Sequence, residues 1–493
     1  MNSKPDFGVR PFVLFFTFCL IFASFNSVAQ EQLGLKLSNY SGINSTFINP
    51  AWTATSKFNW DVNLVAGGAF FQNNYGFLEN TSVMSLLKSD FNFASRPDLN
   101  GETPGEGSII ADYYRGNNKK QIHLSQFVTG PSVMVKVGNH SFGVTTNFRA
   151  MASSTNIPAS LGYYQLSEQA LNEPFTVDPF QVSGMAWSEI GLNFSTKLME
   201  TYDGSIYIGG SVKFLQGYEA FYFDNQQQAT ITLLPQDTAS LQTINVGYGF
   251  ASNVLFDDAT GESYDFQRNG SGIGFDLGAV FTMGEDGEGN YKLKLGASLL
   301  DVGKITFKER TEQHQLTLDP AFLVSLDDYE NIDSREELVN LVSSQVFGDS
   351  AQSFVDGRFG MALPTALSVQ ADLAVAGPIF VNAAVVRRIA GKGSGLKRTN
   401  IIAVTPRVEW RWLEVSVPVS LVNDKWLQVG TSVRLGPLTV GSENLGGMFN
   451  SKDELTGSDF YVALKINPFF TVNKGGSKGS GRGKSGNVKC YNF

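Results

Sequence analysis

Cysteine is nearly absent from this chain of 493 residues, which contains only two. Cys19 lies in the apolar N-terminal stretch and Cys490 in the C-terminal tail, so no disulfide can form within an exported chain that has lost its signal. The three histidines, His123, His140 and His314, lie far apart and have no carboxylate or cysteine at metal-ligand spacing. We therefore expect neither a metal nor a cofactor, and we interpret the histidines as surface or turn residues.

Charged residues are also scarce, at 17% of the chain, and the formal net charge is −9. No basic stripe occurs outside the C-terminal tail, so the composition argues against a nucleic-acid partner. The sequence has no phosphate-binding loop, no Gly-x-Ser-x-Gly elbow and no paired-cysteine site, and we expect the protein not to be an enzyme. A Ser, His and acid set assembled from separate strands is an alternative that the spacing leaves open.

Long apolar runs are missing after the N-terminus, where nothing approaches the roughly 18 consecutive residues of a transmembrane helix. The N-terminus has Lys4 and Arg10, an apolar stretch over 12–25 and the small-x-small sequence of 27–29. This pattern predicts a signal peptide over residues 1–29 and therefore export. An exported chain of this kind can cross a membrane only as a closed β-barrel, in which every backbone polar group is paired.

The sequence does contain segments in which apolar and polar residues alternate. The clearest is 187–214, where the alternation runs on both sides of a turn at 202–205. The apolar face comprises Ile190, Leu192, Phe194, Leu198, Ile206, Ile208, Val212 and Phe214. The polar face comprises Glu189, Asn193, Ser195, Lys197, Tyr207, Ser211 and Lys213. A period of two with one apolar face predicts a β-hairpin, and we expect Asp203-Gly204 to supply the positive φ of its turn.

Similar alternation recurs along the chain and predicts an all-β fold, an antiparallel transmembrane β-barrel of about fourteen strands with an N-terminal plug segment. Long and short connections alternate, as in outer-membrane barrels, whose short turns face the periplasm. One of the short turns, at 410–412, has neither Gly nor Pro. Five tryptophans lie near expected strand ends, as aromatic girdles require: Trp60, Trp187, Trp410, Trp412 and Trp426.

We expect four regions: a signal peptide over 1–29, an N-terminal hatch or plug over 30–57, the outer-membrane barrel over 58–470, and a disordered, basic, Gly/Ser-rich periplasmic tail over 471–493. Long loops are expected at 153–186 and at 219–270, the second with strand extensions. Short helices are expected near Ser82–Lys88 and from a cap near Asp333-Ser334, with Glu336 and Glu337 in the first turn.

Charged residues on the inward faces of the expected strands are of mixed sign, whereas a selective ion pore would carry one sign. They are Asp61, Arg149, Glu189, Lys197, Lys213, Asp276, Lys292, Asp372, Arg407, Glu414 and Arg434. We interpret them as a charge network that braces a partly plugged lumen.

Two short motifs, Asn39-Tyr40-Ser-Gly-Ile and Asn49-Pro50-Ala51, precede the first expected strand, and the segments 436–447 and 460–465 end the series. Together they resemble an uncharacterised family of Gram-negative outer-membrane barrels over most of the mature chain. More distantly, the chain is similar to FadL-type long-chain fatty-acid transporters, whose hatch carries Asn-Pro-Ala, and to PorV-like secretion shuttles. The resemblance implies a location in the cell outer membrane and makes Asn49, Pro50 and Ala51 candidate plug or ligand residues.

The resemblance implies two functions, because one barrel fold hosts many. The barrel would bind or pass a hydrophobic small molecule, or it would be a non-transporting scaffold or shuttle for a surface or secretion protein complex. A protein partner would be held at the outer loops or at the basic tail, and outer-membrane lipid is a partner in both cases. A continuous apolar path past Asn49-Pro50-Ala51 favours transport, and a lumen closed by the mixed charges favours the scaffold.

Overall fold

The computed structural model describes residues 31–87, 92–99, 101–251, 267–285, 290–329, 332, 335–389 and 394–468. The expected signal peptide, the basic tail with Cys490 and the helix cap near Asp333-Ser334 lie outside the described residues. Within them the chain is predominantly β-structure. No helix among these residues is long and apolar enough to span a membrane.

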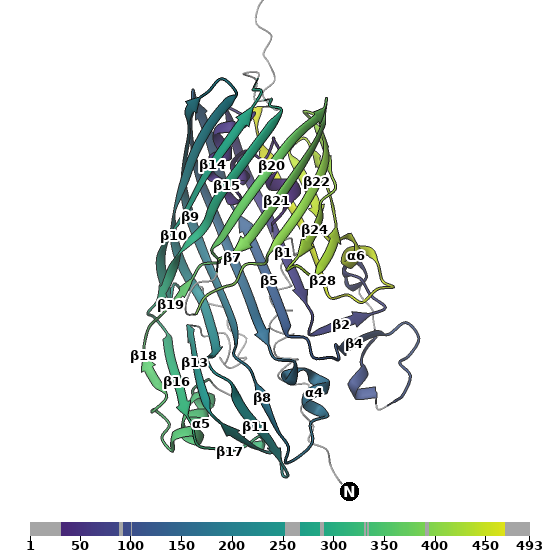
Figure 1. The fold of residues 1–493 in the computed structure, drawn as a ribbon, viewed down its shortest axis with the longest axis vertical. Helices are drawn as coiled ribbons and strands as arrows, with labels where there is room; N and C mark the ends of the chain where they lie inside the picture. Colours follow the sequence, from purple (N-terminus) through teal and green to yellow (C-terminus); the bar gives the residue numbers. More distant parts are fainter. Residues whose placement is uncertain are drawn as a thin grey trace, which may run out of the picture.

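Fourteen antiparallel strands close into a barrel, which confirms the predicted fold class (Figure 1). The barrel closes where β1 (Trp60–Asn73) pairs with β28 (Gly457–Ile466). Four of the strands consist of two segments each. Pro131, Pro364 and Pro418, which have no backbone N–H, interrupt three of them, and the fourth is interrupted at Gly430. Between β1 and β28 the strands are β5 (Lys120–Thr129) with β6 (Ser132–Val137), β7 (His140–Ile157), β9 (Phe180–Glu200), β10 (Gly204–Asn225), β14 (Gly270–Met283), β15 (Leu293–Phe307), β19 (Phe359–Ala362) with β20 (Ala366–Ala376), β21 (Ile379–Arg388), β22 (Ile401–Glu409), β23 (Leu413–Ser416) with β24 (Val419–Val422), β25 (Trp426–Val429) with β26 (Thr431–Leu435), and β27 (Leu438–Ser442).

The outer surface of the barrel is apolar, as the alternation predicts. On neighbouring strands the exposed side chains include Phe142, Val144, Ile190, Leu192, Phe194, Phe214, Ile273, Phe275, Leu277, Leu367 and Val369. Their polar neighbours along the same strands point inward and are buried, for example Glu189, Asn193 and Lys213. An apolar wall around a polar interior fits lipid. The barrel therefore lies in the outer membrane. In outer-membrane barrels the short turns face the periplasm.

The turn between β9 and β10 differs from the prediction, because neither Asp203 nor Gly204 has a positive φ. The turn instead closes through the Thr201 N–H, which donates to the carbonyl of Gly204 at 2.7 Å. Glycine is required at 204 for another reason, since a Cβ there would collide with the carbonyl of Thr282 on β14. The turn at 410–412 forms as predicted, with the Trp410 N–H donating to the Leu413 carbonyl at 2.7 Å.

Tryptophan placement agrees with the girdle prediction only in part. Trp410 and Trp412 are 49% and 50% exposed at the short-turn end of the barrel, where a girdle residue belongs. Trp187 is wrong for a girdle, because it lies within β9 and is fully buried. The alternation over 187–200 does not reveal that β9 begins seven residues earlier, at Phe180.

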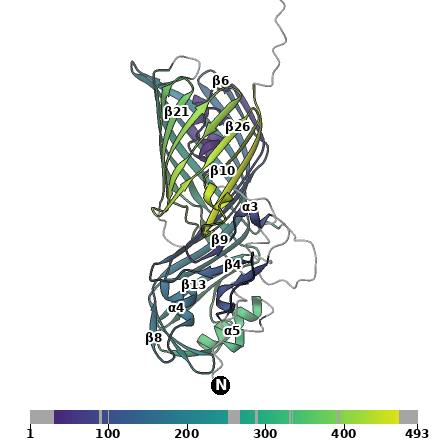
Figure 2. The same cartoon turned by 90° about the vertical axis from the view of Figure 1, so that its right-hand side faces the viewer.

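Strands β7, β9 and β10 continue past the barrel at the end opposite the short turns and carry an outer extension (Figures 1 and 2). The predicted loop at 153–186 is therefore partly strand. The extension contains β8 (Pro174–Val177), β11 (Ala229–Leu234), β12 (Thr238–Gln242), β13 (Ile244–Ala251), β16 (Thr311–Leu318), β17 (Phe322–Ser325) and β18 (Phe354–Asp356), with the helices α4 (Tyr163–Ser167) and α5 (Arg335–Phe347). Helix α5 carries Glu336 and Glu337 in its first turn, as predicted.

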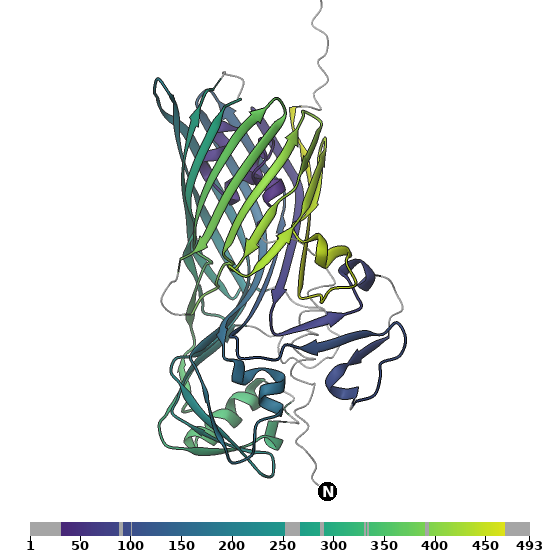
Figure 3. The same cartoon turned by 45° about the vertical axis from the view of Figure 1, so that its right-hand side comes forward.

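A small sheet lies beside the barrel, formed by β2 (Gly76–Glu79), β3 (Phe93–Ser95) and β4 (Ile109–Tyr113) (Figure 3). The predicted short helix near Ser82 is present as α3 (Val83–Leu86), and the Ser82 hydroxyl accepts from the N–H of Ser85. Helix α3 packs against α6 (Leu445–Phe449).

Candidate functional site

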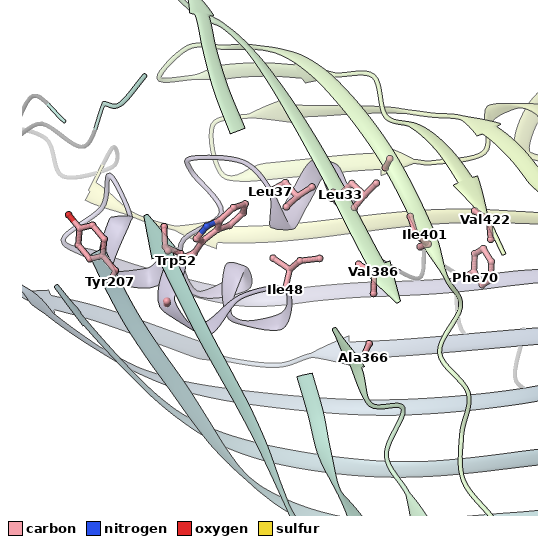
Figure 4. Packing of buried hydrophobic residues seen from close by; sticks show 14 of the residues in the cluster. Leu33, Leu37, Ile48, Trp52, Phe70, Tyr207, Ala366, Val386, Ile401 and Val422 are labelled. Atoms are coloured by element: carbon pink, nitrogen blue, oxygen red, sulfur yellow. The ribbon is translucent and has the colours of Figure 1, made fainter. Parts of the chain in front are cut away.

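The first described residues, 31–57, lie inside the barrel at its short-turn half and form a plug (Figures 1 and 3). The plug has three short helices, α2 (Leu33–Lys36), η1 (Gly42–Phe47) and η2 (Pro50–Thr55). Figure 4 shows Leu33, Leu37, Ile48 and Trp52 packed within the apolar cluster that the inner barrel wall completes. Nearly every plug residue is buried, so the plug fills this half of the lumen.

Asn49 fixes the middle of the plug to the barrel wall. Its side-chain oxygen accepts from the N–H of Ala51 at 3.0 Å and caps η2. Its amide nitrogen lies 3.1 Å from Gln370 Oε1 and 3.2 Å from the carbonyl oxygen of Ala279. One short side chain therefore both starts a plug helix and binds two barrel strands.

Pro50 and Ala51 approach the wall so closely that the facing barrel residues are glycines. The Pro50 carbonyl accepts from the amide of Asn193 at 3.2 Å. A Cβ on Gly209 would lie 2.7 Å from both the Pro50 oxygen and the Ala51 Cα, and a Cβ on Gly278 would collide with the side chain of Asn49. The glycines of β10 and β14 thus provide the space that this segment occupies.

Charged side chains from the plug, five barrel strands and the connection before β22 meet where the plug begins. We call them the plug-start cluster: Glu31, Arg149, Glu189, Lys213, Asp276, Asp301 and Arg398. Asp301 is at its centre, with Lys213 Nζ at 2.7 Å, Arg149 Nη1 at 2.9 Å and Arg398 Nη1 at 3.2 Å. Arg398 also binds Glu31 through two hydrogen bonds of 2.6 and 2.7 Å. Buried charges of this kind are stable only as a paired set.

A second group of charges lies nearer the short turns and also binds the plug. Arg407 pairs with Asp372 at 2.7 Å, and Arg434 pairs with Glu414 at 3.2 Å. The hydroxyl of Ser38 in the plug donates to Glu414 at 2.6 Å. The wall at this level is therefore joined to the plug as well as to itself.

The remaining inward charges are placed differently. Asp61 binds Lys465 at 3.1 Å and accepts from the plug N–H of Ile43 at 2.9 Å. Lys197 pairs with Glu200 and Glu285 beside the short turns, apart from both larger groups. Lys292 is exposed in the turn before β15 and does not face the lumen.

Lys294 faces inward in place of Lys292, and its amine contacts Asn39 at 3.1 Å. Sequence reasoning also left out Glu31, Asp301 and Arg398. Asp301 lies at a bulge of β15, where Asp301 has φ +54° and Gly303 has φ +155°. In the sequence only the glycine hints at this bulge, so the signal for Asp301 is weak. No pattern in the sequence indicates that Arg398 faces the lumen, because its partner Glu31 lies 367 positions away.

A cavity of about 40 Å³ lies beside the plug-start cluster. Its lining includes four cationic side chains, Lys36, Arg149, Lys213 and Arg398, against the two carboxylates of Glu31 and Asp301. The Lys36 amine lies 5.8 and 5.7 Å from the ring centres of Phe47 and Phe127, and it makes no hydrogen bond or ion pair among the described residues. Lys36 is in the plug and not in a membrane-spanning strand, and burial lowers the pKa of its amine to about 8.

The lumen beyond the plug-start cluster is apolar. We call this set the outer lumen cluster: Met151, Met185, Trp187, Leu215, Ala220, Tyr222, Ala251, Ile305, Phe307, Phe359, Met361, Leu363 and Leu396. It touches the charges directly, since the Arg149 guanidinium lies 4.8 Å from the Trp187 ring centre and 3.6 Å from the Met151 sulfur. A hydrophobic face and a charged layer thus meet in the middle of the barrel.

Two histidines are buried, which contradicts the surface interpretation: His123 is 3% and His314 is 2% exposed. His314 lies 3.0 Å from the hydroxyl of Ser353 and 3.3 Å from Glu312. Ser353 is 1% exposed and its N–H donates to Ser343 of α5, so these contacts hold α5 against β16. The side chains of His314 and Ser353 are shielded from solvent.

Residues 50–443 match the model of a family described as a family of unknown function (DUF5723). This match confirms the resemblance to an uncharacterised family. No curated protein sequence matches the chain.

Among solved structures, a TodX mutant (deltaS2S3) monoaromatic hydrocarbon channel has a TM-score of 0.41 and 11% identity over 87% of this chain and 95% of that one. The Ralstonia pickettii toluene transporter TbuX has a TM-score of 0.38 and 10% identity over 87% and 94%. A Pseudomonas aeruginosa FadL homologue has a TM-score of 0.24 and 8% identity over 86% and 94%.

Proposed function

The chain belongs to this family of unknown function, and we propose that it binds a hydrophobic small molecule in the outer lumen cluster and passes it inward when the plug start moves. The observation that carries the proposal is the outer lumen cluster itself. The interior of an outer-membrane barrel is ordinarily polar. An apolar lining directly outside the plug gives a hydrophobic ligand a favourable place to stop.

Binding requires rearrangement, because the cavity of about 40 Å³ is far smaller than the roughly 300–1,000 Å³ of a ligand site. The outer lumen cluster is suited to this, since Met151, Met185 and Met361 have unbranched, flexible side chains. We infer that the ligand replaces contacts among these side chains.

A ligand that moves inward from the outer lumen cluster would next contact the plug-start cluster. Lys36 is a buried cation without an ion-pair partner among the described residues, and it lines the cavity beside Met151. A ligand with an acidic end would give Lys36 the partner that it lacks and would compete with Glu31 for Arg398. Separation of Glu31 from Arg398 would free the first residues of the plug.

The competing function is a non-transporting scaffold or shuttle, which predicts a lumen closed by charges. Paired charges do interrupt the apolar path between the outer lumen cluster and Asn49. Transport therefore depends on movement of the plug start, and a plug that never moves would leave the scaffold as the better proposal.

A fluorescent probe that brightens in apolar surroundings, 1-N-phenylnaphthylamine, tests the binding site on purified protein in detergent. We expect saturable binding that Met361→Glu weakens by about tenfold, because a carboxylate would enter an apolar site. Met361→Leu is the matched control and should bind as the native protein does. Equal binding by all three proteins would remove the outer lumen cluster as the site.

A further inference from the structure

A second and larger cavity lies in the outer extension, apart from the lumen. Its volume is about 640 Å³, within the range of ligand sites, and it is open to solvent on one side. Its lining residues come from the segments 117–119, 158–160, 165–170 and 173–178. Two elements in these segments, α4 and β8, are labelled in Figures 1 and 2. Since the short turns of outer-membrane barrels face the periplasm, we expect this cavity to face the cell exterior.

The lining is polar, which excludes a hydrophobic ligand. Of its side chains only Pro158, Ala159 and Ala170 are apolar, and the others carry amides, hydroxyls, three carboxylates and one lysine. The excess of carboxylates also disfavours an anion such as phosphate. Two of the three carboxylates are already paired with cations, Glu168 with Arg115 and Asp178 with Lys119, so the site has little free charge for a cationic ligand. The lining therefore favours a neutral ligand rich in hydrogen-bonding groups, and a cationic partner is an outcome of the test below.

Part of this polar lining is already engaged, and part is free to bind. Glu168 is held by Arg115 at 2.9 Å, and Asp178 accepts from the amide of Gln228 at 2.8 Å. By contrast, the side chains of Asn117, Glu173 and Thr176 make no hydrogen bond or ion pair with any residue that the structure describes.

Those three free groups are an amide, a carboxylate and a hydroxyl, which together donate and accept. A carboxylate accepts strongly from a hydroxyl, and an amide both donates to and accepts from one. We propose that this pocket binds a neutral saccharide at the outer face of the cell. The pocket is separate from the lumen, so the proposal does not depend on transport.

Saturation-transfer difference NMR on the full chain tests the proposal. The protein is kept in an amine-oxide detergent, because alkyl glycosides would compete for a saccharide site. Two probes distinguish the source of the sugar: the uncharged fraction of the oligosaccharides released by mild acid from the cells' own outer-membrane glycolipid, and free maltotriose. We expect saturation transfer to one of them, with affinity lowered about tenfold in both Glu173→Gln and Thr176→Val.

Asp203→Asn, an exposed change at the opposite end of the barrel, is the control and should leave the affinity unchanged. Binding of the glycolipid oligosaccharide would assign the site to the cell surface, and binding of maltotriose would assign it to free sugar. No binding of either probe, or binding that the two lining variants leave intact, would overturn the proposal. Binding of tetralysine alone, weakened by Glu173→Gln, would overturn it in favour of a cationic partner.

Discussion

Arg398 binds Glu31 through two nitrogens at once, with Nε 2.6 Å from Oε1 and Nη2 2.7 Å from Oε2. The pair joins the first described residue of the plug to the connection before β22. Both side chains are almost fully buried, at 6% and 0% exposure. A two-point contact in this setting is strong and directional, and it fixes where the plug begins.

Arg398→Met should loosen the start of the plug, because it leaves the carboxylates of Glu31 and Asp301 without a shared partner. Removing one member of a buried ion pair costs about 3–5 kcal/mol. Hydrogen exchange by mass spectrometry should show faster exchange over residues 31–40. The matched control is Arg387→Met, whose pair with Asp424 is exposed and is worth about 1 kcal/mol or less. Equal effects of the two variants would contradict the importance of the buried pair.

Asn49→Ala should destabilise the plug by about 1–3 kcal/mol, because it removes both the cap of η2 and the bonds to the barrel wall. Asn49→Asp keeps an acceptor for the Ala51 N–H but loses the donor to Gln370, and so it separates the two roles. Thermal unfolding followed by tryptophan fluorescence measures both variants. If Asn49→Ala unfolds at the native temperature, the motif does not hold the plug.

Gly209→Ala should displace the plug, because the new methyl group would lie 2.7 Å from the backbone of Pro50 and Ala51. Overpacking of this kind costs about 1–3 kcal/mol. Planar-bilayer recordings should show larger ion conductance than the native protein. Gly67→Ala is the control, since its nearest neighbour is the Phe127 oxygen at 3.9 Å. A native conductance for Gly209→Ala would mean that the plug tolerates the displacement.

Lys36→Met should stabilise the protein at pH 7 by about 1–3 kcal/mol, because it removes a buried cation and keeps the chain length. Burial lowers the pKa of Lys36 from 10.5 to about 8. Between these values the unfolded chain binds a proton that the folded chain has released, so the stability contributed by Lys36 rises with pH.

The advantage of Lys36→Met over the native protein should therefore shrink as the pH is raised from 8 to 10.5. Denaturant titrations of both proteins across this range measure it. A difference that stays constant with pH would show that Lys36 does not titrate in this window.

The barrel could be predicted from the sequence because its strands alternate with a period of two between lipid and lumen, as Ile190 and Glu189 show. The plug motif could be located because Asn49-Pro50 stands just before the first strand. The ion-pair partners could not be predicted, since Glu31 and Arg398 are brought together only by closure of the barrel. The outer extension could be predicted only in part, as strand extensions within 219–270. Its other side could not, because alternation does not reveal that β7 and β9 remain paired as far as Thr155 and Gln181.

Native mass spectrometry of the protein, extracted gently from outer membranes, distinguishes passage of a hydrophobic molecule from a scaffold role. We expect a monomer that retains adducts with the mass of small hydrophobic molecules, and these should be lost in Met361→Glu but kept in Met361→Leu. A stoichiometric protein partner without such adducts would contradict binding in the outer lumen cluster and would favour the scaffold.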